Sequence, residues 1–172
     1  MKRFVFTFAA VMNLLLLDQV VKALAVARLK GTMPIRVLDG FFNLAYVENR
    51  GCAWGMFQGQ VWPLAVFAMV AMAFVIWKRR AIFPMGKVGA IAEITLYAGI
   101  LGNLVDRLLA AGWANFGRGY VIDMFDFYAR WGGAEHHFPC FNVADVYINI
   151  AAGLLIVTSL FASRQGERRE SA

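Results

Sequence analysis

Four long apolar runs divide the chain, at residues 4–27, 61–77, 88–111 and 141–162. A hydrocarbon core ~30 Å thick needs roughly 20 helical residues to cross it. All four runs therefore qualify as membrane-spanning helices, although the second is only just long enough. The pattern predicts a mostly α-helical integral membrane protein, built as a four-transmembrane-helix bundle.

The segment 32–60, between the first and second runs, has a different pattern. Residues 35–38 and 41–47 are rich in β-branched and aromatic side chains, and Asp39-Gly40 between them is a hairpin signal. We expect a small extracytoplasmic β-sheet here, lying on the membrane surface. It would be part of a single membrane domain that covers residues 1–172.

Composition supports a membrane protein over a soluble one. Hydrophobic residues make up 60% of the chain and charged residues 16%, and the mean hydropathy is +0.59. A soluble domain is only about 45–50% apolar. The two cysteines, Cys52 and Cys140, are too few for a disulfide framework and form no C-x-x-C motif, which disfavours thiol-redox chemistry.

The net charge of +6 would suit a nucleic-acid partner, but the basic residues form no DNA-reading motif. They flank the apolar runs instead, at Lys2-Arg3, at 78–80 with Lys87, and at 164–169. Because basic residues gather on the cytoplasmic side of membrane proteins, both termini are expected in the cytoplasm and no nucleic-acid partner is expected. The segments 28–60 and 112–140 then face outward.

The N-terminus also has the pattern of a cleavable signal peptide, with a basic start, an apolar stretch and Ala23-Leu24-Ala25 as a cleavage-like site. Asp18 at the end of the apolar stretch argues against cleavage, and the first run is long enough to span. We therefore favour an uncleaved first helix.

Two aspartates lie where an apolar chain tolerates charge least. Asp123 is flanked by Val121, Ile122 and Met124, and Asp145 stands at the entrance of the fourth run. An ionisable group at such a place costs a few kcal/mol unless it is paired or hydrated. Two carboxylates that meet can share one proton as acid and base, which is the chemistry of aspartyl hydrolysis.

Further polar residues fall on shared helix faces. Asp18 and Lys22 are four residues apart, so they can form a structural ion pair or line a site. Gly99, Asn103, Asp106 and Arg107 follow one face of the third run, either as a structural polar seam or as part of a site. Asn142, three residues before Asp145, can cap the fourth helix.

Other protease classes lack their motifs. His136-His137 belong to no H-E-x-x-H, so a zinc site is unsupported and no metal is expected. There is no G-x-S-x-G setting for a serine nucleophile. Neither aspartate stands in a Gly-x-Gly-Asp string, which argues against a presenilin-like protease.

Taken together, five strings in order resemble the bacterial lipoprotein signal peptidase (signal peptidase II) family. They are Asp18-x-x-x-Lys22, Asn49-Arg50-Gly51-x-Ala53, Gly99-x-x-Gly102-Asn103-x-x-Asp106-Arg107, Val121-Ile122-Asp123 and Phe141-Asn142-x-Ala144-Asp145. Each string alone is weak, but the five together on a four-span chain are highly specific. The chain departs from the family pattern at Cys52, Trp54 and Ala98, and in longer stretches at 107–123 and 129–139.

The resemblance implies a cofactor-free aspartyl endopeptidase of the bacterial inner membrane, with its site near the outer face. It would remove the signal peptide from diacylglyceryl-modified prolipoproteins, cutting before the lipidated cysteine. Its partners would be these substrates, membrane lipid and globomycin-type inhibitors, and a monomer is expected.

By motif position, the resemblance implies a catalytic dyad of Asp123 and Asp145. The supporting or substrate-contacting residues would be Asp18, Lys22, Asn49, Gly51, Gly99, Asn103, Arg107, Asn142 and Ala144. We expect Asp145, near a helix N-terminus, to start ionised as the base and Asp123 to act as the acid. The rival hypothesis is a small transporter or assembly factor, whose buried charges would form a proton relay across the bilayer.

Overall fold

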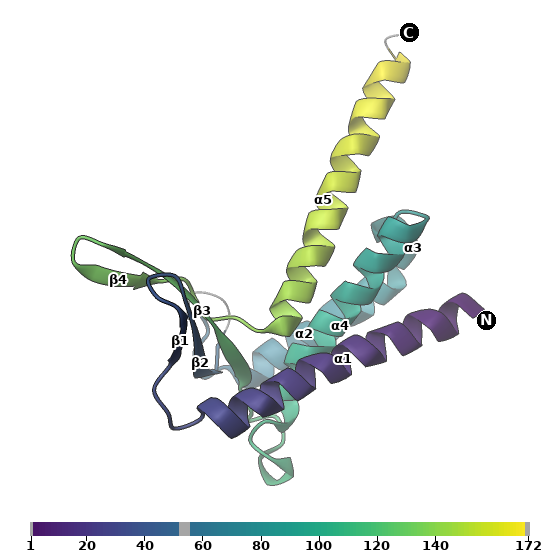
Figure 1. The fold of residues 1–172 in the computed structure, drawn as a ribbon. Coiled ribbons are helices and arrows are strands. Elements are labelled where there is room, and N and C mark those ends of the chain that lie inside the picture. The colour runs from purple at the N-terminus through teal and green to yellow at the C-terminus, as the bar shows by residue number, and fades with distance from the viewer. Residues whose placement is uncertain (1, 52–55, 171–172) are drawn as a thin grey trace.

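The computed structural model describes residues 2–51 and 56–170, with the side chains of 113 and 162–170 left aside. The described residues form four long helices, α1 (Lys2–Leu29), α2 (Val61–Trp77), α4 (Lys87–Leu109) and α5 (Val143–Glu170), and a short α3 (Arg79–Ile82). A 3₁₀ turn, η2 (Trp113–Asn115), follows α4. Both ends of the chain and α3 lie away from the β-sheet (Figure 1).

Three of these helices are long and apolar enough to cross a membrane: α1, α4 and the part of α5 at Val143–Phe161. The predicted runs at 4–27 and 88–111 are confirmed as helices to within a few residues, and the run at 141–162 is confirmed as a helix that continues beyond the predicted end to Glu170. The second run is confirmed as α2, but its 17 residues reach only about 25 Å at 1.5 Å per residue, short of the hydrocarbon thickness. The three long apolar helices support a membrane location, and a fourth crossing by α2 is not confirmed.

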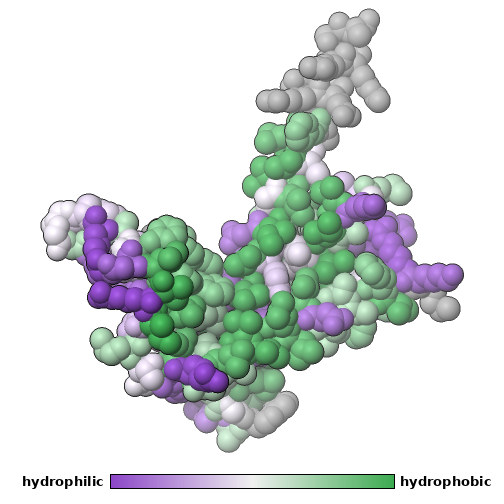
Figure 2. Space-filling view, in the orientation of Figure 1, coloured by the Kyte–Doolittle hydropathy of each residue, from purple (hydrophilic) through white to green (hydrophobic). Residues whose placement is uncertain are grey.

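The outer surface of the helices is apolar. Phe4, Phe67 and Phe161 are among the large side chains that remain more than half exposed, which is expected where lipid rather than water surrounds a helix. Figure 2 shows this apolar surface over the helices, with polar residues gathered at the tip of the sheet and at the opposite end near the N-terminus and α3.

Helix α4 is the centre of the bundle and contacts α1, α2 and α5. Small residues allow this close approach. A Cβ added at Gly99 would lie 2.5 Å from the carbonyl oxygen of Ala144 on α5, and one at Gly102 would lie 2.6 Å from Oδ2 of Asp18 on α1. The two glycines therefore set how closely α1 and the start of α5 pack on α4.

The sheet is antiparallel, in the order β1 (Ile35–Leu38), β2 (Phe42–Asn49), β3 (Val121–Trp131) and β4 (Ala134–His137). The hairpin predicted around Asp39-Gly40 is confirmed. The sheet is larger than predicted, however, because the second hairpin, β3–β4, was not expected as strands. Its sequence signal is Gly132-Gly133, a two-residue turn with φ of +62° and +78°.

Pairing of β2 with β3 brings distant residues together. Val47 lies opposite Asp123, and Asn49 lies opposite Val121. The sheet is fixed to the helices by a buried apolar cluster in which Ala25 and Leu29 of α1 belong with Met124 of β3. This contact holds the first residues of β3 beside the end of α1.

Candidate active site

Asp123 lies near the start of β3 and is almost fully buried, with 1% of its surface exposed. Two side-chain amides donate to its carboxylate. Asn142 Nδ2 lies 2.6 Å from Oδ1, and Asn49 Nδ2 lies 3.0 Å from Oδ2. The carboxylate is thus held from the start of α5 on one side and from the end of β2 on the other.

Asp145 lies in the first turn of α5, in a reciprocal cap with Asn142. The backbone N–H of Asp145 donates to Asn142 Oδ1 at 3.1 Å, and the backbone N–H of Asn142 donates to Asp145 Oδ2 at 3.2 Å. This arrangement is a capping box. The predicted cap is therefore present. The other oxygen of Asp145 accepts a 2.7 Å hydrogen bond from Asn103 Nδ2 on α4.

Asn142 also connects the two carboxylates. Its side-chain nitrogen, which donates to Asp123, donates to Asn103 Oδ1 at 3.1 Å as well. Asp123 and Asp145 therefore belong to one hydrogen-bonded network, joined through Asn142 and Asn103. Three chain segments that are far apart in the sequence meet at this point: the end of β2, α4, and the β3–α5 region.

The surroundings raise the pKa of Asp123 to about 7. Burial is the main cause, and the negative charge of Asp145 adds to it, while the hydrogen bonds from Asn49 and Asn142 oppose the shift. A carboxyl group with such a pKa can hold a proton near neutral pH, as the acid of a carboxylate pair must.

A buried ion cluster lies next to this pair. Lys22 Nζ lies 2.9 Å from Asp18 Oδ2 and 2.8 Å from Asp106 Oδ2, and all three side chains are at most 3% exposed. Gln19 Nε2 donates to both carboxylates, at 3.1 Å and 2.9 Å. The predicted Asp18–Lys22 pair is therefore confirmed, but Lys22 is shared with Asp106, a residue of the predicted polar face of the third run that the list of supporting residues did not include.

The ion cluster touches the backbone beside each aspartate of the pair. Asp18 Oδ1 accepts a 2.9 Å hydrogen bond from the N–H of Ala144, the residue before Asp145. Asp106 Oδ2 accepts a 3.1 Å hydrogen bond from the N–H of Ile122, the residue before Asp123. Lys22 also donates to Asn103 Oδ1 at 3.2 Å. The cluster thus joins α1 and α4 to the starts of β3 and α5.

Arg107 connects α4 to the segment after β2. Its Nη2 donates to the carbonyl oxygen of Gly51 at 3.2 Å, and the N–H of Gly51 donates to Asn49 Oδ1 at 3.0 Å. Arg107 is therefore linked through Gly51 to Asn49, whose side-chain amide holds Asp123. The nearby Cys52, Ala53 and Trp54 lie outside the described residues.

The predicted site residues thus gather around one point. Five of them contact the aspartate pair or belong to the ion cluster beside it: Asp18, Lys22, Asn49, Asn103 and Asn142. Gly99 and Ala144 lie where α4 meets α5, and Gly51 and Arg107 are hydrogen-bonded to each other at the edge of the site. The structure adds Gln19, which the sequence analysis did not name, and it places Asp106 of the predicted polar face in the ion cluster. Among the described residues, no group of three or more His, Cys, Asp or Glu side chains is placed to hold a metal ion.

The fold and this site together describe a helical membrane protein with a buried and a half-buried carboxylate in one polar network, the kind of site that suits hydrolysis. Comparison with known proteins identifies the family. Residues 10–161 match the family model described as signal peptidase (SPase) II. The chain therefore belongs to the signal peptidase II family, which is a family of membrane proteases.

Individual relatives agree over most of the chain. A lipoprotein signal peptidase of Fusobacterium nucleatum is 36% identical over 153 residues, which are 88% of this chain and 84% of the relative. One of Shewanella sp. (strain MR-4) is 34% identical, over 87% of this chain and 82% of the relative. The fold is similar to a bacterial membrane enzyme solved by the in meso method at 2.3 Å, with a TM-score of 0.70, 26% identity, and coverage of 92% of this chain and 89% of the other.

Proposed function

We propose that this protein is an aspartyl endopeptidase that removes the signal peptide from diacylglyceryl-modified prolipoproteins, cutting just before the lipidated cysteine. The observation that carries the proposal is the amide network that joins Asp123 to Asp145 in a chain of the signal peptidase II family. The relatives named above are lipoprotein signal peptidases, which suggests the substrate class.

In the proposed reaction, ionised Asp145 takes a proton from a water molecule while that water attacks the scissile carbonyl carbon. Protonated Asp123 gives its proton to the carbonyl oxygen, which yields a neutral gem-diol. Asp145 then gives the proton that it took from water to the amide nitrogen, Asp123 takes a proton from a gem-diol hydroxyl as the C–N bond breaks, and the new carboxyl and amino termini leave. The pair is thereby returned to its starting state, with Asp123 protonated and Asp145 ionised. The raised pKa of Asp123 supports its role as the acid.

The neighbours of the pair suit the positioning of these groups. Asn49 and Asn142 each hold one oxygen of Asp123, which fixes its orientation. Arg107, held at the carbonyl of Gly51, places a cation at the edge of the site, where it could polarise a substrate carbonyl. We infer that Lys22 acts through Asp18 and Asp106 as a positioning residue, since those carboxylates hold the backbone next to each member of the pair.

The arrangement of charges favours a protease over a proton relay. A relay needs ionisable groups at successive depths through the bilayer. Asp18, Lys22, Asp106 and the aspartate pair form one cluster instead. On α4 the next carboxylate is Glu93, 13 residues or about 20 Å before Asp106, and it pairs with Arg79 at 2.8 Å. Between these carboxylates, the α4 segment from Ile94 to Gly102 has Thr95 and Tyr97 as its hydrogen-bonding side chains and carries no carboxylate or amine. The segment therefore lacks the series of charged groups that a relay along α4 would need.

We propose the bacterial inner membrane as the location, with four crossings, both termini in the cytoplasm and the site near the outer face. The basic residues near the N-terminus, α3 and the C-terminus support this orientation, because all three lie away from the sheet. The substrate's lipid would lie between the helices. No cofactor is needed, globomycin-type peptides would inhibit, and the enzyme would act as a monomer.

A gel-shift cleavage assay tests the proposal directly. Purified protein is incubated with a prolipoprotein that carries the diacylglyceryl group and with the same prolipoprotein lacking it. Cleavage of the lipidated form, with a new N-terminus at the modified cysteine, is expected. Lack of cleavage of the lipidated form, or a cut elsewhere, would overturn the assignment.

A further inference from the structure

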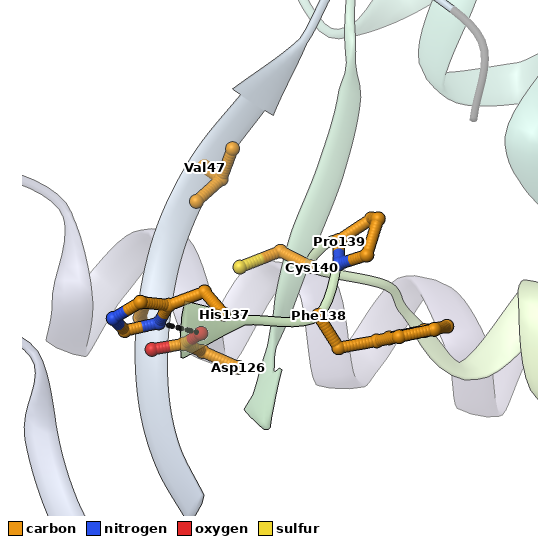
Figure 3. A pocket seen from close by; sticks show the side chains of 7 residues that line it. Val47, Asp126, His137, Phe138, Pro139 and Cys140 are labelled. Carbon is orange, nitrogen blue, oxygen red and sulfur yellow. Dashed lines mark hydrogen bonds and ion pairs between the residues drawn. The ribbon is translucent and has the colours of Figure 1, made fainter. Parts of the chain in front are cut away.

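An open cavity of about 550 Å³ lies in the β-sheet region. Ala45 and Val47 of β2, Asp126 of β3 and His137 of β4 line it, together with the linker residues Phe138, Pro139 and Cys140 that lead into α5. Figure 3 shows these side chains, with a dashed line for the hydrogen bond between His137 of β4 and Asp126 of β3 and with Val47 on β2. None of them belongs to the sequence-based site.

The polar side of this cavity is built from a buried carboxylate. Asp126 is 5% exposed, and its Oδ2 accepts a 2.9 Å hydrogen bond from Asn43 Nδ2. Its Oδ1 lies 2.6 Å from Nδ1 of His137, whose ring also stacks on Tyr128. The positions of Asp126 and His137 are therefore fixed by several contacts, as expected of a preformed binding surface.

The cavity lies beside the proposed dyad. Val47 is the residue that pairs with Asp123 across β2 and β3. Cys140 stands two residues before Asn142, and the charges of Asp126 and Asp123 both act on its thiol, whose pKa burial raises to about 12. Asp126 is three residues from Asp123, or about 10 Å along an extended strand.

We propose that this cavity is the subsite for the side chain that follows the lipidated cysteine of the substrate, and that it favours uncharged or basic side chains over acidic ones. The inference rests on the proposed function and adds a specificity determinant on the mature side of the cleaved bond. No residue of the dyad or of the ion cluster takes part in it.

The position of the cavity selects the mature side. The apolar stretch of a signal peptide must lie in the membrane beside the helices, whereas the mature chain leaves the membrane on the side of the sheet. The lining residues come from three strands and from the linker 138–140, and not from a membrane-spanning helix. If the scissile carbonyl is bound at Asp123, a residue one beyond the cysteine, at about 3.3 Å per residue, would extend its side chain toward Val47, which pairs with Asp123 and lines the cavity.

The charges around the cavity select the kind of side chain. Asp126 lines it, and Glu135 Oε2 lies 3.7 Å from Nε2 of His137. An acidic side chain would meet these two carboxylates and be disfavoured, whereas a lysine would be attracted and a serine or glycine would be indifferent. Ala45, Val47 and Pro139 supply apolar walls for the stem of a longer side chain.

A size test uses Val47→Trp, which fills the cavity from an exposed strand position. Lipidated peptide substrates with Gly, Lys or Asp after the cysteine are compared by kcat/KM. Val47→Trp should lower kcat/KM for the Lys substrate at least ~10-fold more than for the Gly substrate. The matched control is Val37→Trp, because Val37 is also an exposed strand valine but lies outside the cavity; the Lys/Gly ratio should stay at the wild-type value. An unchanged ratio in Val47→Trp would overturn the subsite.

A charge test uses Asp126→Asn, which keeps the shape of the side chain. The wild-type protein should cleave the Asp substrate roughly 5- to 10-fold less efficiently than the Lys substrate, and Asp126→Asn should reduce that difference. Equal cleavage of both substrates by wild type, or an unchanged difference in the variant, would refute the charge preference. If wild type cleaved none of the lipidated peptides, the proposed function itself would fail, which is a distinguishable result.

Discussion

Lys22 offers the sharpest test of how the site is held together. Replacing it by methionine keeps most of its volume but leaves Asp18 and Asp106 facing each other without a cation. Their side chains are 0% and 3% exposed, and Lys22 lies within 3 Å of both. Removing one partner of a buried ion pair costs roughly 3–5 kcal/mol. For a chain of this length that corresponds to a melting temperature roughly 6–20 °C lower.

The loss of activity should follow from the loss of position. The carboxylates of Asp106 and Asp18 accept hydrogen bonds from the backbone N–H groups of Ile122 and Ala144. Repulsion between the two carboxylates would therefore displace Ile122 and Ala144, which directly precede Asp123 and Asp145. We expect kcat to fall while KM changes little, because the buried Lys22 side chain would not contact the substrate. Lys30→Met is the control, since Lys30 is half exposed and forms a surface pair with Glu48. Such pairs contribute at most about 1 kcal/mol.

A triple variant separates position from chemistry. Asp18→Asn, Lys22→Met and Asp106→Asn together remove all three charges but retain side-chain oxygens that can accept the two backbone hydrogen bonds. Both the melting temperature and kcat should recover relative to Lys22→Met alone, and the double change of Asp18 and Lys22 should recover less, because it leaves Asp106 charged. If Lys22→Met abolished turnover at an unchanged melting temperature, Lys22 would belong to the reaction itself and this reasoning would be wrong.

Three further predictions concern acidity, packing and topology. Because Asp123 must carry its proton and has a pKa of about 7, kcat/KM should fall as pH rises through that value; Asn49→Ala removes a hydrogen bond that lowers this pKa, so its alkaline limb should move to higher pH, and an unmoved limb would count against Asp123 as the acid. Gly102→Ala should lower melting temperature and activity, since the added Cβ would meet Asp18 Oδ2 at 2.6 Å, whereas Gly153→Ala, with nothing within 4 Å, should not; equal effects would contradict the packing argument. Reporter fusions after Arg80 and at the C-terminus should report the cytoplasm and a fusion at Gly133 the opposite side; a C-terminus outside would exclude four crossings.

The helices could be predicted from the sequence because each depends on a local pattern. The run 61–77 coincides with α2, and the reciprocal cap at Asn142 and Asp145 begins α5 at the start of the fourth apolar run, as expected. Strand β3 was missed because Asp123 and Asp126 are both buried, so its residues show no alternation of apolar and polar side chains.

The partners of the site residues were harder to predict. Helical spacing identifies neighbours on the same helix, and it therefore found Asp18 beside Lys22. Asp106 is 84 positions from Lys22, so their contact depends on how α1 packs against α4, which no local pattern contains. For the same reason the sequence indicated Asn142 as a helix cap but could not show that its amide also holds Asp123.

The central claim is that Asp123 and Asp145 act as one catalytic unit, and single and double substitutions measure this most directly. Asp123→Asn, Asp145→Asn and the double variant are assayed on a lipidated prolipoprotein, with Asp39→Asn as an exposed-turn control and melting temperatures as a check on folding. Each single variant should lose at least ~10²-fold in kcat while remaining folded, and the double variant should be no worse than either one. Near-normal turnover by either folded single variant, or losses that multiply in the double variant, would contradict the dyad.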